Sequence, residues 1–255
     1  MLHQHQARHD WVYTHSNGFL ARRRENEATG MYSRVHEDCE LSANTDKNSS
    51  AKSIRRRQSM PYVLVLYYSR YGAVAKMAQQ VARGIESIAN VEVRIRTVPN
   101  ISTVSEAVEE KVPSAGPPYA THEDVRDAIG IALGSPTRFG NMAAPLKHFI
   151  DSLSGLWFSG ELVDKPVGFF SSTSSLHGGQ ETTLLSMMLP MIHLGMIVVG
   201  VPYTESDLST TQTGGTPYGP THMAGKDSKN PLSDEEKRLC QALGKRLATI
   251  ALKLY

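Results

Sequence analysis

The chain has 255 residues, of which 40% are hydrophobic and 20% are charged, a composition typical of a globular protein with one sizeable core. Its 27 basic and 25 acidic residues give a formal net charge of +2, too small an excess for a protein built around nucleic-acid phosphates. No apolar run approaches the roughly 20 residues of a membrane-spanning helix, and no secretory signal is visible, so we expect neither membrane insertion nor export. Cys39 and Cys240 are too few for a disulfide framework, which favours a reducing compartment and predicts a cytoplasmic location.

The first 59 residues differ in character from the rest of the chain. They are polar, carry clusters of arginine among scattered acids, and show no helical or strand periodicity. This pattern predicts a disordered N-terminal extension over 1–59 and a single folded domain over 60–255. His3, His5 and His9 lack cysteine partners and an ordered scaffold, so we interpret them as solvated side chains rather than metal ligands.

From Met60 onward, apolar runs alternate with amphipathic segments, which is the pattern of a parallel sheet with crossover helices. Strands are expected at 62–68, 91–98, 128–133, 167–170 and 196–201. Helices are expected after the first strand, at 141–153, at 180–194 and from a capping box at Ser233 and Glu236 to the C-terminus. The sequence thus predicts an α/β fold, a doubly wound five-stranded parallel sheet with helices on both faces, whose ligands bind beyond the carboxyl ends of the strands.

The loop after the first strand has the features of a phosphate-binding turn. It combines a hydroxyl, a glycine and the start of a helix, where free backbone N–H groups and the helix dipole attract an anion. It matches neither the dinucleotide-binding glycine pattern nor the Walker pattern, and a plain capped helix start is the alternative. The candidate cofactor-binding residues here are Ser69, Arg70, Tyr71, Gly72, Ala73 and Val74.

The loops after the third and fourth strands suit a flat polar heterocycle, because their backbone N–H groups and hydroxyls can bond a ring edge, ribityl oxygens and phosphate. The third-strand loop contributes Thr137, Arg138 and Phe139. The fourth-strand loop contributes Ser172, Thr173, Ser174, Ser175, Leu176, His177 and Gly178.

Five motifs in this order resemble one known family. They are Ser69-Arg-Tyr-Gly72, Pro136-Thr-Arg-Phe-Gly-Asn-Met142, Gly155-Leu-Trp157, Gly178-Gly-Gln-Glu181 and Gly214-Gly-Thr-Pro-Tyr-Gly219. The chain is similar, over essentially all of Pro61 to Leu254, to the WrbA flavoproteins, the type IV NAD(P)H:quinone oxidoreductases. This resemblance implies a flavodoxin-like fold and FMN held by the three loops, with NADH or NADPH as co-substrate and a quinone as acceptor. It also implies that Tyr71 lies near the nicotinamide and Trp157 near the quinone, in a homotetramer whose neighbouring subunits complete the active sites.

Two segments depart from the family pattern. Ser174, Ser175 and His177 replace glycines in the fourth-strand loop, which changes the backbone path expected there. The family's His-His-Gly is His193-Leu194-Gly195 here, so the flavin contact of the second histidine is not carried over, and His193 is interpreted as a packed or interfacial residue. Trp157 alone could be a core residue, but its neighbouring glycines favour an exposed loop and a quinone pocket wall.

The expected mechanism uses no catalytic acid and no metal, because hydride passes from the nicotinamide to the flavin and two electrons then pass to the quinone. If both substrates lie flat on one face of the flavin, ping-pong kinetics follow. A flavodoxin-like carrier of single electrons is the alternative from another class, although its recognition surface should be strongly acidic. A binding protein that has lost its flavin is a third possibility, raised by the altered fourth-strand loop.

Overall fold

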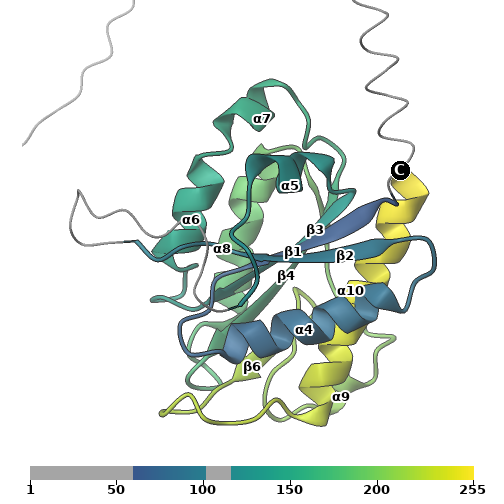
Figure 1. The fold of residues 1–255 in the computed structure, drawn as a ribbon. Coiled ribbons are helices and arrows are strands. Elements are labelled where there is room, and N and C mark those ends of the chain that lie inside the picture. The colour runs from purple at the N-terminus through teal and green to yellow at the C-terminus, as the bar shows by residue number, and fades with distance from the viewer. Residues whose placement is uncertain (1–59, 102–115) are drawn as a thin grey trace, which may run out of the picture. The chain divides into compact units, whose positions relative to one another are not determined.

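The structure, a computed structural model, describes residues 60–101 and 116–255 (Figure 1). The extension predicted over 1–59 lies outside these residues. The described part of the chain has a central sheet in the strand order β2-β1-β3-β4-β5, and all of its neighbouring strands are parallel. The strands are β1 (Tyr62–Tyr67), β2 (Glu92–Thr97), β3 (Gly130–Pro136), β4 (Pro166–Thr173), β5 (Ile197–Val199) and β6 (Thr221–Met223). The predicted doubly wound parallel sheet is confirmed.

Helices cover both faces of the sheet (Figure 1). α4 (Ala73–Glu86) and α10 (Asp234–Leu254) pack on one face, against alternate side chains of β1 such as Val63 and Val65. The opposite face, which includes Leu64 and Leu66, is covered mainly by α5 (His122–Asp127), α6 (Ala144–Asp151) and α8 (Gln180–His193). Every residue of β1 is therefore buried, which explains why its sequence is continuously apolar or aromatic.

Four of the helices begin in one of two ways. α5 and α10 each start at a capping box, in which a side chain accepts a hydrogen bond from a backbone N–H of the first turn. α4 and α8 start instead after left-handed glycines, Gly72 with φ of +86° and Gly179 with φ of +96°, and neither has a side-chain cap. Because the first N–H groups of a helix have no partner within it, α4 and α8 point free donors toward the carboxyl edge of the sheet. The hydroxyl cap expected before α4 is not formed.

The fifth strand position is shared by two short strands. β5 pairs with the beginning of β4, from Pro166 to Gly168, and β6 pairs with its end, from Ser171 to Thr173. The intervening segment contains the short helix α9 (Asp207–Thr210). The strand expected at 196–201 is therefore shorter than predicted, and β6 is a further strand that was not predicted. This pairing carries residues 224–228 to the carboxyl edge of the sheet, beside the loop that follows β4.

Two further elements differ from the predictions. The helix expected at 141–153 is found as the shorter α6, and a further short helix, α7 (Ser154–Phe158), follows it. Trp157 is consequently in a helix rather than in the expected loop. α5 is an additional short helix, and its start is fixed by Thr121 and Asp124, which bond each other's backbone N–H groups. α4, α8 and α10 match their predicted positions, and the left-handed Gly195 follows the end of α8.

Candidate functional site

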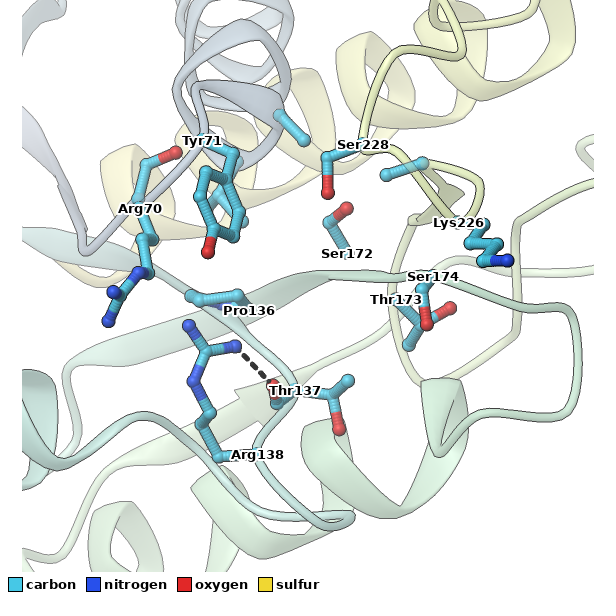
Figure 2. A pocket seen from close by; sticks show the side chains of 14 residues that line it. Arg70, Tyr71, Pro136, Thr137, Arg138, Ser172, Thr173, Ser174, Lys226 and Ser228 are labelled. Atoms are coloured by element: carbon cyan, nitrogen blue, oxygen red, sulfur yellow. Dashed lines mark hydrogen bonds between the residues drawn. The ribbon is translucent and has the colours of Figure 1, made fainter.

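A pocket of about 260 Å³ lies at the carboxyl edge of the sheet, where the predicted loops meet (Figure 2). The structure brings together residues of all three loops in its lining: Ser69, Arg70, Tyr71, Ala73, Val74, Thr137, Arg138, Ser172, Thr173 and Ser174. Pro136, Ala224, Lys226 and Ser228 complete the lining. The volume is slightly below the roughly 300–1,000 Å³ of typical ligand pockets. The pocket has room for a phosphate and a short polyol, and a flat ring system attached to them would project beyond it.

Several predicted residues do not line this pocket. Gly72 sets the left-handed turn before α4, and a side chain there would meet no protein atom within 4 Å, so its φ of +86° is what favours glycine. Phe139, at φ of +52°, is exposed at the tip of the loop after β3. Ser175, Leu176, His177 and Gly178 form the tip of the loop after β4, and the first three of them are exposed.

The turn before α4 has the chemistry of an anion site. The Oγ atom of Ser69 is buried and has no hydrogen-bond partner among the residues that the structure describes. The first turn of α4 lies wholly in the described range and carries no acidic side chain, whereas the first turn of α10 carries Asp234, Glu235 and Glu236. A buried hydroxyl without an acceptor, free N–H groups and the positive end of a helix together fit a phosphate dianion.

Positive side chains surround the opening of the pocket. Arg70, Arg138 and Lys226 line it from three different segments, and no carboxylate is among its described lining residues. Figure 2 shows the guanidinium groups of Arg70 and Arg138 on the side of Pro136, and Lys226 on the opposite side near Ser174. The pocket is therefore electrostatically suited to a ligand that carries negative charge or gains it on reduction.

Thr137 is held in place by α8 and β4. Its backbone N–H donates to the Ser172 carbonyl at 3.0 Å, and its Oγ1 atom accepts a hydrogen bond from the Thr183 hydroxyl at 2.9 Å. Arg138 in turn donates from Nη1 to the Thr137 carbonyl at 2.7 Å, which orients the guanidinium group. The loop after β3 is thus rigidly attached to the two elements beside it.

The wall formed by residues 224–228 was missed in the sequence, and a buried pair positions it. His222 Nδ1 and Glu236 Oε2 are 2.8 Å apart, and the other carboxylate oxygen of Glu236 accepts from the Met223 N–H at 3.2 Å. Burial raises the pKa of Glu236, but hydrogen bonds to His222, Ser233 and Met223 outweigh it and hold that pKa below its usual value. Because Glu236 also completes the capping box of α10, it fixes β6 to the start of that helix. β6 has only three residues, too few to show a strand pattern in the sequence.

Trp157 lies outside the pocket of the single chain. It is exposed on α7 and contacts Phe158, with 4.7 Å between ring centroids. Further exposed apolar side chains lie on α8 and β5: Leu185, Leu189, Ile192 and Ile197. The first three recur on α8 with the spacing of one helix face, and His193 is exposed at the end of the same helix. These residues form an apolar outer surface that the packing of the described domain does not use.

Residues 60–101 and 116–255 contain no group of three or more histidine, cysteine or acidic residues arranged to hold a metal ion. None of their helices is both long enough and apolar enough to cross a membrane. Cys240 is buried, and burial raises the pKa of its thiol, with a further increase from the charge of Glu236.

The sequence model of the family described as NADPH-dependent FMN reductase matches residues 63–209. The chain belongs to this family. It is also 41% identical over 201 residues to a protein of Solidesulfovibrio magneticus named NAD(P)H dehydrogenase (quinone), an alignment that covers 75% of this chain and 98% of that relative. The resemblance to type IV quinone oxidoreductases is thereby confirmed.

Solved structures support the family's fold in this chain. A flavodoxin, WrbA-like protein from Agrobacterium tumefaciens superimposes with a TM-score of 0.55 at 24% identity, covering 76% of this chain and 99% of that one. A flavodoxin from the domain Archaea gives a TM-score of 0.50 at 20% identity, covering 75% and 99%. At these identities the likeness concerns the fold alone, and it confirms the predicted flavodoxin-like architecture.

Proposed function

We propose that this protein is an FMN-dependent NAD(P)H:quinone oxidoreductase, which reduces quinones to hydroquinones by two electrons from NADH or NADPH. The observation that carries the proposal is the 41% identity to an NAD(P)H dehydrogenase (quinone) over 98% of that relative. The family match, which names FMN and NADPH, supports the same activity. The pocket supports it independently, because its anion-binding turn and hydroxyl-rich walls lie at the edge of the sheet where such folds bind ligands.

The residues present fit FMN. Ser69 and the free N–H groups at the start of α4 would hold the phosphate, and the Ser172, Thr173 and Ser228 hydroxyls lie in the same pocket for the ribityl oxygens. The loop after β3 would flank the ring system. One phosphate-binding turn at a helix start is visible in the sequence and no second turn of this kind, which favours FMN over FAD. When bound, FMN would supply the chemistry, accepting hydride from the nicotinamide and delivering two electrons to the quinone.

The protein's own part is to bind, orient and stabilise charge. Tyr71 is exposed at the pocket opening, where its ring can support the nicotinamide. The three cations of the lining favour the negative charge that the site gains on reduction. The described lining contains no carboxylic acid and no histidine, and we expect its residues to act by position and charge.

We further propose a homotetramer. The unused apolar surface of α8, with Leu185, Leu189 and Ile192, supports association of identical copies. Trp157 lies outside the pocket of its own chain, so a neighbouring copy is needed if it is to contact a quinone bound there. The cytoplasm is the proposed location, favoured by the scarcity of cysteine.

Steady-state kinetics test the proposed activity. Varying NADH at several fixed concentrations of benzoquinone should give parallel double-reciprocal lines, because the oxidised nucleotide leaves before the quinone enters. Intersecting lines would contradict a single shared site. Failure of both NADH and NADPH to reduce the flavin, together with rapid reduction by a flavodoxin reductase, would reject the enzyme and establish the single-electron carrier.

A further inference from the structure

Two arginines face one another at the pocket opening with nothing negative between them. Figure 2 shows the Arg70 side chain descending from the turn before α4 and the Arg138 side chain rising from the loop after β3, so that both guanidinium groups lie beside Pro136. Neither forms an ion pair within the described part of the chain. Arg70 instead lies over the ring of Tyr71, with 5.6 Å from its guanidinium carbon to the ring centroid, and Arg138 donates to the Thr137 carbonyl.

This arrangement is favourable for an anion and unfavourable without one. Two guanidinium groups repel each other, whereas an oxyanion between them can accept hydrogen bonds from both planar forks. The carbonyl bond at 2.7 Å already orients Arg138, which reduces the entropy lost when an anion binds. The two arginines thus form a partly solvent-exposed anion clamp, here called the arginine pair.

The phosphate of FMN has a different place to bind. The unpartnered Ser69 hydroxyl is buried and the free N–H groups of α4 begin at Ala73, whereas the side chains of Arg70 and Tyr71 are exposed. The arginine pair is at the opening, beside the ring of Tyr71, where the proposed function puts the nicotinamide. The arginine pair is therefore a better site for an anionic group of the nicotinamide co-substrate than for the phosphate of FMN.

We propose that Arg70 and Arg138 bind the diphosphate bridge of the nicotinamide dinucleotide, a proposal that rests on the proposed function of this site. The diphosphate begins one ribose away from the nicotinamide, so it is within short reach when the nicotinamide lies at Tyr71. The additional phosphate of NADPH is on the adenosine ribose, at the far side of the diphosphate. The arginine pair consequently strengthens the binding of NADH and NADPH alike and does not select between them.

The experiment compares hydride donors with and without phosphate. FMN-loaded wild-type protein, Arg70→Gln and Arg138→Gln are mixed anaerobically with NADH, with NADPH or with N-benzyl-1,4-dihydronicotinamide, and bleaching of the flavin is followed at several concentrations. Each variant should require roughly tenfold or more NADH and NADPH for half-maximal rate, as expected for losing a charged hydrogen bond. The benzyl donor has no phosphate, so the concentration of it that gives half-maximal rate should be the same in all proteins. Arg246→Gln, which removes an exposed arginine of α10, is the charge-matched control.

Binding without chemistry provides the second readout. Calorimetric titration of ADP, which carries a diphosphate but no nicotinamide, should show weak binding to the FMN-loaded wild type and to Arg246→Gln, and a loss of roughly tenfold or more in affinity in both arginine-pair variants. Both arginine-pair variants should lose less affinity for FMN than for ADP, and Arg246→Gln should lose affinity for neither.

Each contrary result identifies a different error. An equal increase in the half-saturating concentration of the benzyl donor would overturn the inference, because the arginines would then act on the flavin or on the fold. A parallel loss of FMN affinity would overturn it in favour of the cofactor's phosphate as the bound anion, and unchanged ADP binding would overturn it outright. If ADP binding depends on the arginine pair but none of the donors reduces the wild-type flavin, the phosphate clamp stands and the proposed function fails.

Discussion

Replacing Ser69 with alanine should weaken FMN binding and stabilise the protein without FMN. Its Oγ atom is buried and has no partner among the described residues, which costs the FMN-free protein about 1 kcal/mol or more. When the phosphate binds, the same hydroxyl becomes a donor to a charged group, an interaction worth about 1.5–3 kcal/mol. Ser69→Ala should therefore raise the FMN dissociation constant by roughly 10- to 150-fold while raising the free energy of unfolding of the FMN-free protein.

Ser171→Ala is a matched control for this prediction. Ser171 also has a buried Oγ atom without a partner among the described residues, but it does not line the pocket. It should show the gain in stability without the loss of FMN affinity. FMN affinity is measured by quenching of FMN fluorescence, and stability by urea denaturation of the FMN-free proteins. If Ser69→Ala binds FMN as tightly as the wild type does, the phosphate lies elsewhere and the assignment of the turn before α4 is wrong.

Four other predictions test separate parts of the account. Trp157→Ala should slow reoxidation of the reduced enzyme by benzoquinone without changing FMN affinity, and unchanged reoxidation would remove Trp157 from the quinone site. The folded-state pKa of Glu236 lies below its usual value of 4.5, so the ionised carboxylate should stabilise the fold above pH 4.5, and this contribution should be lost as the pH falls through the lowered pKa. Urea denaturation at several acidic pH values should therefore show that the free energy of unfolding depends less on pH in Glu236→Gln than in the wild type. An unchanged pH dependence would refute the assignment. Cys240 is buried, and burial raises the pKa of its thiol. In a Cys39→Ser protein this thiol should resist thiol reagents while the protein is folded and react once it is unfolded. Rapid labelling of the folded protein would contradict the burial of Cys240. The shortened chain Met60–Tyr255 should fold and retain FMN, and an insoluble or flavin-free product would give residues 1–59 a folding role.

The fold could be predicted from the sequence because burial on both faces leaves a clear pattern. β1 is apolar or aromatic at every position, and the stripe of α10 begins at a capping box that the sequence shows directly. β6 left no such pattern, since it has three residues and is defined by pairing with the end of β4. The extent of α6 and α7 was likewise not predictable, because the break between them changes the chain direction without interrupting the apolar periodicity.

The candidate site was predictable where it depends on strand ends and was missed where it depends on tertiary contacts. Residues directly after β1, β3 and β4 converge because parallel strands end at the same edge. Lys226 and Ser228 reach the pocket because the buried His222–Glu236 pair holds β6, a contact between residues 14 positions apart that no local pattern reveals. The position of Trp157 outside the pocket depends on α7, which a glycine-flanked tryptophan did not predict.

The most direct test of the central claim is a complete reaction cycle in one anaerobic cuvette. FMN-loaded protein receives one equivalent of NADH, or of NADPH, and then one equivalent of benzoquinone, while the flavin absorption is recorded throughout. The account predicts that the nucleotide bleaches the flavin in a single two-electron step and that the quinone restores the oxidised spectrum with one equivalent of hydroquinone formed. A flavin that neither nucleotide reduces, or a reduced flavin that benzoquinone does not reoxidise, would contradict it.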